Sequence, residues 1–217
     1  VAFIGSTGSG KTTLVNLLPR FFDVTEGAIR FGDIDIRDVS QKELRNRIGY
    51  VPQKGILFSG TIASNLRYAD ENLSDEKMEE ALSISQAKEF VDRMPNGVNE
   101  PIAQGGTNVS GGQKQRLSIA RALAKDAQVY IFDDTFSALD YATDAKLRTA
   151  LAGLIAKKHA TVFIVAQRIS SIMHADKIIV LDQGKMAGIG THEELLKSCE
   201  VYQEIAHSQL SREELGE

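Results

Sequence analysis

Residues Gly5-Ser6-Thr7-Gly8-Ser9-Gly10-Lys11-Thr12 match the phosphate-binding pattern G-x-x-x-x-G-K-[ST] at every position, and this motif is typical of one class of α/β fold. Glycines let the backbone curl until successive N–H groups point inward at phosphate oxygens. The Lys11 ammonium can reach the β- and γ-phosphates of a nucleotide, and the Thr12 hydroxyl can ligate Mg²⁺. We therefore expect the residues from Gly5 to Thr13 to bind the phosphates of a nucleoside triphosphate.

The residues on either side supply the context that this motif requires. Val1-Ala2-Phe3-Ile4 is an apolar run that predicts a buried strand, and residues 13–18 predict a helix. The N-terminus of such a helix favours anions. Because Val1 already lies inside the predicted strand, we expect the chain to be part of a longer polypeptide.

Composition narrows the class of protein. With 217 residues, 42% of them hydrophobic and 25% charged, the chain suits one large α/β domain with a packed core. The net charge of −4 and the absence of a basic block argue against a nucleic-acid partner. Cys199 is the only cysteine, so an internal disulfide is impossible. The apolar runs are far shorter than the roughly 20 residues that span a bilayer, so we expect this chain itself to be soluble.

Strand and helix patterns alternate along the second half of the chain. Predicted strands at 129–132, 161–165 and 177–181 are separated by helical patterns, which indicates a parallel sheet with crossover helices. Earlier, Gly32-Asp33 predicts a hairpin turn, and residues 48–51 predict a strand that Pro52 ends. Residues 73–94, with Ser74 as a helix cap and a break near Ser85, are interpreted as a helical insert in this core.

A second anion-binding motif lies at Val109-Ser110-Gly111-Gly112-Gln113. Two glycines at a helix N-terminus expose backbone N–H groups, and the Ser110 hydroxyl adds a donor. The motif resembles the LSGGQ signature of ATP-binding cassette (ABC) proteins, with Val109 in place of the leucine. The resemblance implies that Ser110, Gly111, Gly112 and Gln113 face the γ-phosphate of an ATP held by another subunit.

The remaining motifs follow in the order of the ABC family, and the resemblance covers essentially the whole chain. Gln53 matches the Q-loop glutamine, which can ligate Mg²⁺ and sense the γ-phosphate. Val129-Tyr130-Ile131-Phe132-Asp133 resembles the Walker B strand, and Ser137-Ala138-Leu139-Asp140 resembles the D-loop. The resemblance thus implies ATP and Mg²⁺ as ligands, with Thr12, Gln53 and Asp133 around the metal.

The family implies the fold and its division. We expect a P-loop NTPase of the α/β class with a RecA-like parallel-sheet core, a helical subdomain and a partial antiparallel β-subdomain. Residues 1–53 and 114–217 would form the core with the β-subdomain remnant, and residues 54–113 the helical subdomain with the signature motif. Segments 57–62 and 190–195 resemble ABC exporters, in which transmembrane helices precede the cassette in the same chain. The cassette would then lie at the cytoplasmic face of the cell membrane.

Two positions beside the expected γ-phosphate depart from the family pattern. The residue after the Walker B aspartate is normally a glutamate that polarises the attacking water, but here it is Asp134. Because aspartate is one methylene shorter than glutamate, its carboxylate lies about 1.5 Å further from the place of the attacking water. A misplacement of about 1 Å can lower the reaction rate by about 10²-fold. The switch histidine is replaced by Gln167, which can donate a hydrogen bond but cannot carry a positive charge.

These departures predict the degenerate half of a heterodimeric ABC exporter, an ATPase whose own site hydrolyses poorly. Asp134, Gln167 and Gln53 are the candidate catalytic residues, and the partner would be a second ABC subunit with the missing glutamate and histidine. A homodimeric exporter half with slow hydrolysis is the main competing interpretation. The motifs also allow a non-transport ABC ATPase, a regulatory nucleotide-binding module without turnover, or an importer cassette. A repair-type ATPase would need a long coiled-coil insert, and residues 54–113 show no heptads.

Overall fold

A computed structural model describes residues 1–211, so the last six residues of the expected domain lie outside the described residues. The described chain forms two compact units. Unit 1 comprises Val1–Asn46, Ile131–Ser137 and the described residues from Val162 onward. Unit 2 comprises Arg47–Tyr130 and Ala138–Thr161.

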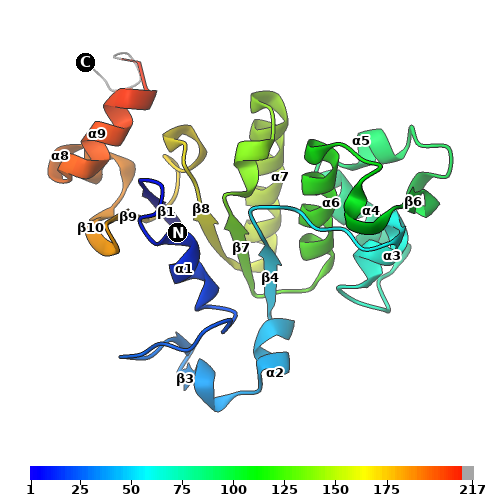
Figure 1. Cartoon of the computed structure of the whole chain (residues 1–217), viewed down its shortest axis with the longest axis horizontal. Coiled ribbons are helices and arrows are strands. Elements are labelled where there is room, and N and C mark those ends of the chain that lie inside the picture. Colours follow the sequence, from blue (N-terminus) through cyan, green and yellow to red (C-terminus); the bar gives the residue numbers. More distant parts are fainter. Residues whose placement is uncertain (212–217) are drawn as a thin grey trace. The chain divides into compact units, whose positions relative to one another are not determined.

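The strands of unit 1 lie in the order β10-β9-β1-β8-β7. Their bounds are β1 Ala2–Gly5, β7 Val129–Asp133, β8 Thr161–Val165, β9 Ile178–Asp182 and β10 Lys185–Gly190. β1 pairs in parallel with both β8 and β9, with Phe3 opposite Val165 and Ile179 (Figure 1). This arrangement confirms the predicted parallel core, and the near-continuous apolar strands agree with burial on both faces.

β10 is the exception, because it runs antiparallel to β9. Gln183 and Gly184 both have positive φ, 46° and 78°, which suits a tight hairpin turn. The sequence pattern did not predict this strand. Its residues, Lys185-Met186-Ala187-Gly188-Ile189-Gly190, are mostly exposed and show little of the apolar pattern that marked the others.

Unit 1 also carries four helices and a small hairpin. The helices are α1 Lys11–Asn16, α2 Gln41–Asn46, α8 His192–Ser198 and α9 Glu200–Gln209. The predicted hairpin is confirmed as β2 Arg30–Phe31 paired antiparallel with β3 Ile34–Asp35. The first helix begins two residues earlier than predicted, because Gly10 already provides its left-handed N-cap.

The C-terminal helix α9 is fixed on unit 1 by a buried cluster. Tyr202 and Ala206 of α9 are fully buried and pack with apolar residues of β1, β9 and the 3₁₀ turn Ile169–Ser171. A hydrogen bond of 2.7 Å joins the Tyr202 hydroxyl to Nδ1 of His192, the first residue of α8. Burial raises the pKa of Tyr202 to about 12, so its hydroxyl stays protonated at neutral pH.

Unit 2 is mainly helical. Its helices are α3 Ile62–Arg67, α4 Asp75–Ile84, α5 Lys88–Val91, α6 Gly111–Ala124 and α7 Tyr141–Lys158. Its strands are β4 Ile48–Val51, β5 Gly60–Thr61 and β6 Pro101–Ile102, and the Arg47 carbonyl before β4 accepts hydrogen bonds from Gln128 and Val129. The predicted helical stretch 73–94 is divided between α4, capped by Ser74, and α5, because Gln86 adopts a left-handed φ of 59°.

Among residues 1–211, no helix combines the length and the hydropathy that a membrane-spanning segment requires.

Replacing Tyr202 tests how much the α9 cluster contributes to stability. The side chain is 0% exposed, so Tyr202→Ala should leave a large cavity and lower the free energy of unfolding by about 3–5 kcal/mol. Urea unfolding followed by circular dichroism would measure the change. Tyr141→Ala is the matched control, because Tyr141 is 73% exposed and should change the midpoint little. Equal shifts in the two variants would contradict this account of the cluster.

Candidate functional site

The parallel register of unit 1 gathers three loops at one edge of its sheet. β1, β7 and β8 end at Gly5, Asp133 and Val165, and the segments that follow them begin at the same edge. The phosphate loop, the acids Asp133 and Asp134, and Gln167 therefore lie together, although more than 150 positions separate the first from the last. We call residues 166–170, after β8, the switch loop.

The phosphate loop depends on glycine at two positions. A side chain at Gly5 would collide with the Leu181 carbonyl of β9, so the strand pairing itself excludes any other residue. Gly10 has a φ of 98° and serves as the N-cap of α1, a conformation that L-amino acids with side chains rarely adopt. Ser6, Thr7 and Gly8 lie at the tip of the loop, where a ligand could reach their N–H groups.

Lys11 is folded back onto the loop. Its ammonium donates to the carbonyls of Gly5 (2.8 Å) and Ser6 (2.7 Å) and to the Ser9 hydroxyl (3.2 Å). An ammonium has three N–H donors, so a phosphate must take over at least one of them. Burial lowers the pKa of Lys11, while the charges of Asp134 and Asp133 act in the opposite direction.

Thr12 and Asp133 form an oxygen-rich pair that fits Mg²⁺. The Thr12 hydroxyl donates to Oδ1 of Asp133 at 2.9 Å, and Asp133 is buried. Between residues 1 and 211 there is no group of three or more His, Cys, Asp or Glu side chains that could form a cage of protein ligands. Mg²⁺ is commonly bound by one or two carboxylates together with substrate phosphates, which agrees with this donor set.

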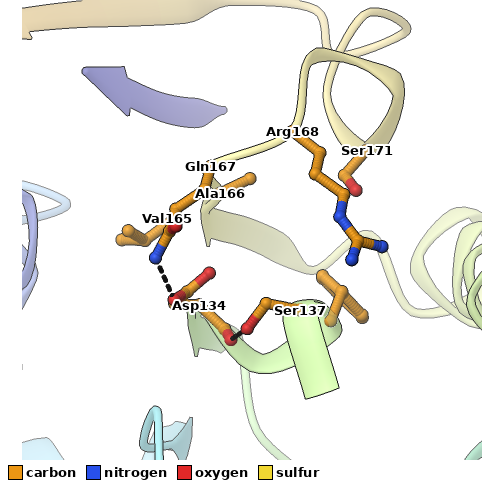
Figure 2. A pocket seen from close by; sticks show the side chains of 8 residues that line it. Asp134, Ser137, Val165, Ala166, Gln167, Arg168 and Ser171 are labelled. Carbon is orange, nitrogen blue, oxygen red and sulfur yellow. Dashed lines mark hydrogen bonds between the residues drawn. The ribbon is translucent and has the colours of Figure 1, made fainter. Parts of the chain in front are cut away.

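Asp134 and Gln167 contact each other directly. Nε2 of Gln167 donates to Oδ2 of Asp134 at 2.6 Å, and Figure 2 shows the amide directed at the carboxylate. The Asp134 backbone is left-handed, with a φ of 46°, and its N–H donates to the Val165 carbonyl of β8 at 3.0 Å. Asp134 is only 6% exposed, so the amide of Gln167 covers part of the small surface through which water could reach it.

A small cavity adjoins this pair. Its volume is about 10 Å³, and its wall includes Asp134, Ser137, Gln167 and Ser171. This space suffices for about one water molecule. The Ser137 hydroxyl donates to the Asp134 carbonyl at 2.8 Å, so the first residue of the D-loop sequence holds the left-handed backbone of Asp134 (Figure 2).

Gln53 lies in unit 2, in the segment after β4. The buried side chain of Gln115, from α6, spans this segment: its Oε1 accepts from the Gly55 N–H at 2.9 Å, and its Nε2 donates to the Pro52 carbonyl at 3.4 Å. A side chain at Gly55 would collide with Ser118 and Gln115. The loop that carries Gln53 is therefore attached to the helix that begins in the signature motif.

The signature motif forms the N-terminus of α6. Ser110 is the N-cap: its hydroxyl accepts from the Gln113 N–H at 3.2 Å, and Oε1 of Gln113 accepts from the Ser110 N–H at 2.9 Å. The Ser110 hydroxyl hydrogen remains able to point outward. Ser110 and Gly111 are exposed, so the N–H group of Gly111 is accessible to a ligand.

Unit 1 thus brings Lys11, Thr12, Asp133, Asp134 and Gln167 together, while Gln53 and residues 110–113 belong to unit 2. The sequence patterns did not identify two contributors. One is the Ser137 hydroxyl, and the other is Gln209, whose side chain contacts the switch loop. The Gln209 contact has no local signal, because the periodicity and motifs of the sequence do not specify which distant backbone a glutamine reaches. The Ser137 contact spans only three residues, and the tendency of serine to bond the carbonyl three or four residues earlier is the signal that could have found it.

Comparison with known proteins agrees with this geometry. Residues 1–137 match the family model described as ABC transporter. An ABC transporter ATP-binding protein of Mycobacterium tuberculosis is 49% identical over 211 residues, which are 96% of this chain and 36% of the relative. An ATP-dependent lipid A-core flippase of Cupriavidus pinatubonensis is 45% identical over 205 residues, which are 93% of this chain and 34% of that protein.

A solved structure is also similar to the described fold. The structure of a bacterial Atm1-family ABC exporter with ATP bound superposes with a TM-score of 0.92 at 36% sequence identity, covering 97% of this chain and 36% of that one. The chain therefore spans about a third of the length of these relatives. The phosphate loop, the Walker B acid and the signature helix agree with the family match over 137 residues. The chain therefore belongs to the ABC transporter family as an ATP-binding domain.

Proposed function

We propose that this chain is the ATP-binding domain of an ABC exporter and that its own site holds ATP but hydrolyses it poorly. Relatives named as a lipid A-core flippase and an Atm1-family exporter support the exporter assignment. In this role the domain lies at the cytoplasmic face of a membrane, attached to transmembrane helices in the same polypeptide. ATP-driven association with a second ABC subunit then drives transport.

Residues 5–13 would bind the phosphates, with Lys11 released from the loop carbonyls to contact the β- and γ-phosphates. Thr12, Asp133 and Gln53 would bind Mg²⁺, which neutralises phosphate charge when bound. Ser110 to Gln113 would contact the γ-phosphate of an ATP on the partner. For the division of the chain, we assign residues 54–113 to the helical subdomain and the remainder to the core.

The Asp134–Gln167 hydrogen bond carries the proposal of poor hydrolysis. A water-positioning acid must reach the water before its pKa matters. Asp134 is one methylene shorter than glutamate, and the amide of Gln167 already occupies one of its oxygens at 2.6 Å. A neutral amide also supplies no positive charge to a developing transition state. The short acid and the neutral amide affect hydrolysis through Asp134 and Gln167 alone. The groups that ATP binding needs, on Lys11, Thr12 and Asp133, match the family pattern.

The partner follows from this asymmetry. A subunit that keeps the glutamate and the histidine would use the signature of this chain, residues 110–113, to complete a hydrolytic site. That partner would carry an altered signature facing the site of this chain. A partner sequence without the glutamate would contradict the proposal. A homodimer needs no such partner, and ATP turnover by the protein alone distinguishes the two assemblies.

The metal assignment can be tested by substitution. Asp133→Asn removes the carboxylate charge beside Thr12, so the strengthening of ATP binding by Mg²⁺ should fall by about 10–100-fold. Titration of ATP by isothermal calorimetry with Mg²⁺ and with EDTA would measure this. Asp33→Asn, in the exposed β2–β3 turn, is the control and should keep the full Mg²⁺ effect. A normal Mg²⁺ effect in Asp133→Asn would remove Asp133 from the metal site.

ATP turnover tests the functional asymmetry. The full-length protein should be nearly inactive alone and active with its co-encoded partner. Asp134→Glu should change the rate of the pair little or lower it, because the longer carboxylate is still next to Gln167 and the partner's site performs most turnover. Turnover of purified protein, alone and paired, would be measured by phosphate release. Ordinary rates for the protein alone would make Asp134 a working catalytic acid and favour the homodimer.

A further inference from the structure

The last residue of α9, Gln209, binds the switch loop at two backbone positions. Its Oε1 accepts from the Ile169 N–H at 2.9 Å, and its Nε2 donates to the Gln167 carbonyl at 2.8 Å. The two backbone groups lie on either side of Arg168. Only this orientation of the amide satisfies both, since a flipped amide would place its NH₂ against an N–H and its oxygen against a carbonyl.

The position from which Gln209 projects is fixed by burial. Ala206 and Tyr202, one and two turns earlier on α9, are fully buried against β1, β9 and the switch-loop residue Ile169, which is itself 0% exposed. The Leu210 N–H donates to the Ala206 carbonyl at 2.8 Å, so the helical hydrogen bonding continues past Gln209. Gln209 therefore connects a rigid apolar cluster to the backbone of the loop.

The loop residue that Gln209 binds is the one whose side chain contacts Asp134. The Gln167 carbonyl is held by Gln209, and the Gln167 amide is held by the Asp134 carboxylate. Rotation of the Gln167 backbone would break the first contact and move the second. We infer that Gln209 is a positioning residue that sets the switch loop, and through it the amide of Gln167. This inference concerns loop geometry and holds whether the site of this chain hydrolyses ATP or only retains it.

A second glutamine on α9 provides a matched control. Nε2 of Gln203 donates to the Leu196 carbonyl of α8 at 2.7 Å. Gln203→Ala therefore removes a similar side chain and a backbone hydrogen bond from the same helix without touching the switch loop. A role of Gln209 limited to α9 stability predicts the same result for Gln203→Ala and Gln209→Ala.

Hydrogen exchange of the full-length protein tests the positioning directly. In Gln209→Ala, the peptide that covers the switch loop should exchange roughly tenfold faster, because two backbone groups lose their partners.

Gln209→Glu keeps the size of the side chain and the acceptor for Ile169, but places a second carboxylate oxygen against the Gln167 carbonyl. At pH 8, where the carboxyl is ionised and cannot donate, this variant should also exchange faster than the wild type. Gln203→Ala should match the wild type in this peptide. Unchanged exchange in Gln209→Ala, or equal exchange in Gln203→Ala, would overturn the inference.

The ratio of ATP affinity to ADP affinity supplies a functional readout, and this part rests on the proposed placement of Gln167 beside the γ-phosphate. Gln209→Ala should lower the ratio several-fold and leave ADP affinity unchanged. Gln167→Ala should do the same, and the double variant should show no further loss, because the two residues act in one chain of contacts. If exchange rises but neither substitution changes the ratio, the positioning stands and the γ-phosphate role fails. If Gln167→Ala lowers the ratio and Gln209→Ala does not, the positioning role is overturned.

Discussion

Parallel pairing of β1 with β8 and β9 is the constraint on which the site of unit 1 depends. Parallel strands end at the same edge of a sheet, so the segments after β1, β7 and β8 start as neighbours. This is how Lys11, Asp133 and Gln167 meet across the length of the chain. The pairing also limits which residues can occupy the edge. The Leu181 carbonyl of β9 leaves no space for a side chain at Gly5, where the phosphate loop begins.

Glutamine side chains hold the two loops that carry Gln53 and Gln167. In unit 2, Gln115 bonds backbone groups on either side of Gln53, and in unit 1 Gln209 bonds the carbonyl of Gln167 and the N–H two residues later. A primary amide suits this task, because its adjacent donor and acceptor match a carbonyl and an N–H that have lost their partners outside regular structure. Each of these two glutamines lies on a helix that is anchored by buried residues, Leu117 and Ile119 on α6 and Tyr202 on α9. Loop positions are thereby fixed by the core.

Sequence reasoning succeeded where the chemistry is local and was incomplete where contacts are distant. The phosphate loop, the strand 48–51 and the hairpin around Gly32-Asp33 each rest on residues within a few positions, and the structure has them where predicted. The exposed strand β10 was missed because its residues lack an apolar pattern. The break in residues 73–94 was predicted near Ser85, where the helical spacing is interrupted, and it separates α4 from α5. The left-handed conformation at Gln86 that accompanies the break was not predicted, since it comes from its context.

Residue types at short spacing were enough to identify the family, the phosphate loop, the Walker B acid, the signature helix and the two departures at positions 134 and 167. The folded chain was needed to see that Asp134 and Gln167 contact each other and that Gln209 holds the switch loop. The contacts of Gln167 and Gln209 join residues that are 33 and 42 positions apart and belong to different elements. Their geometry follows from strand register and core packing, which no local pattern specifies.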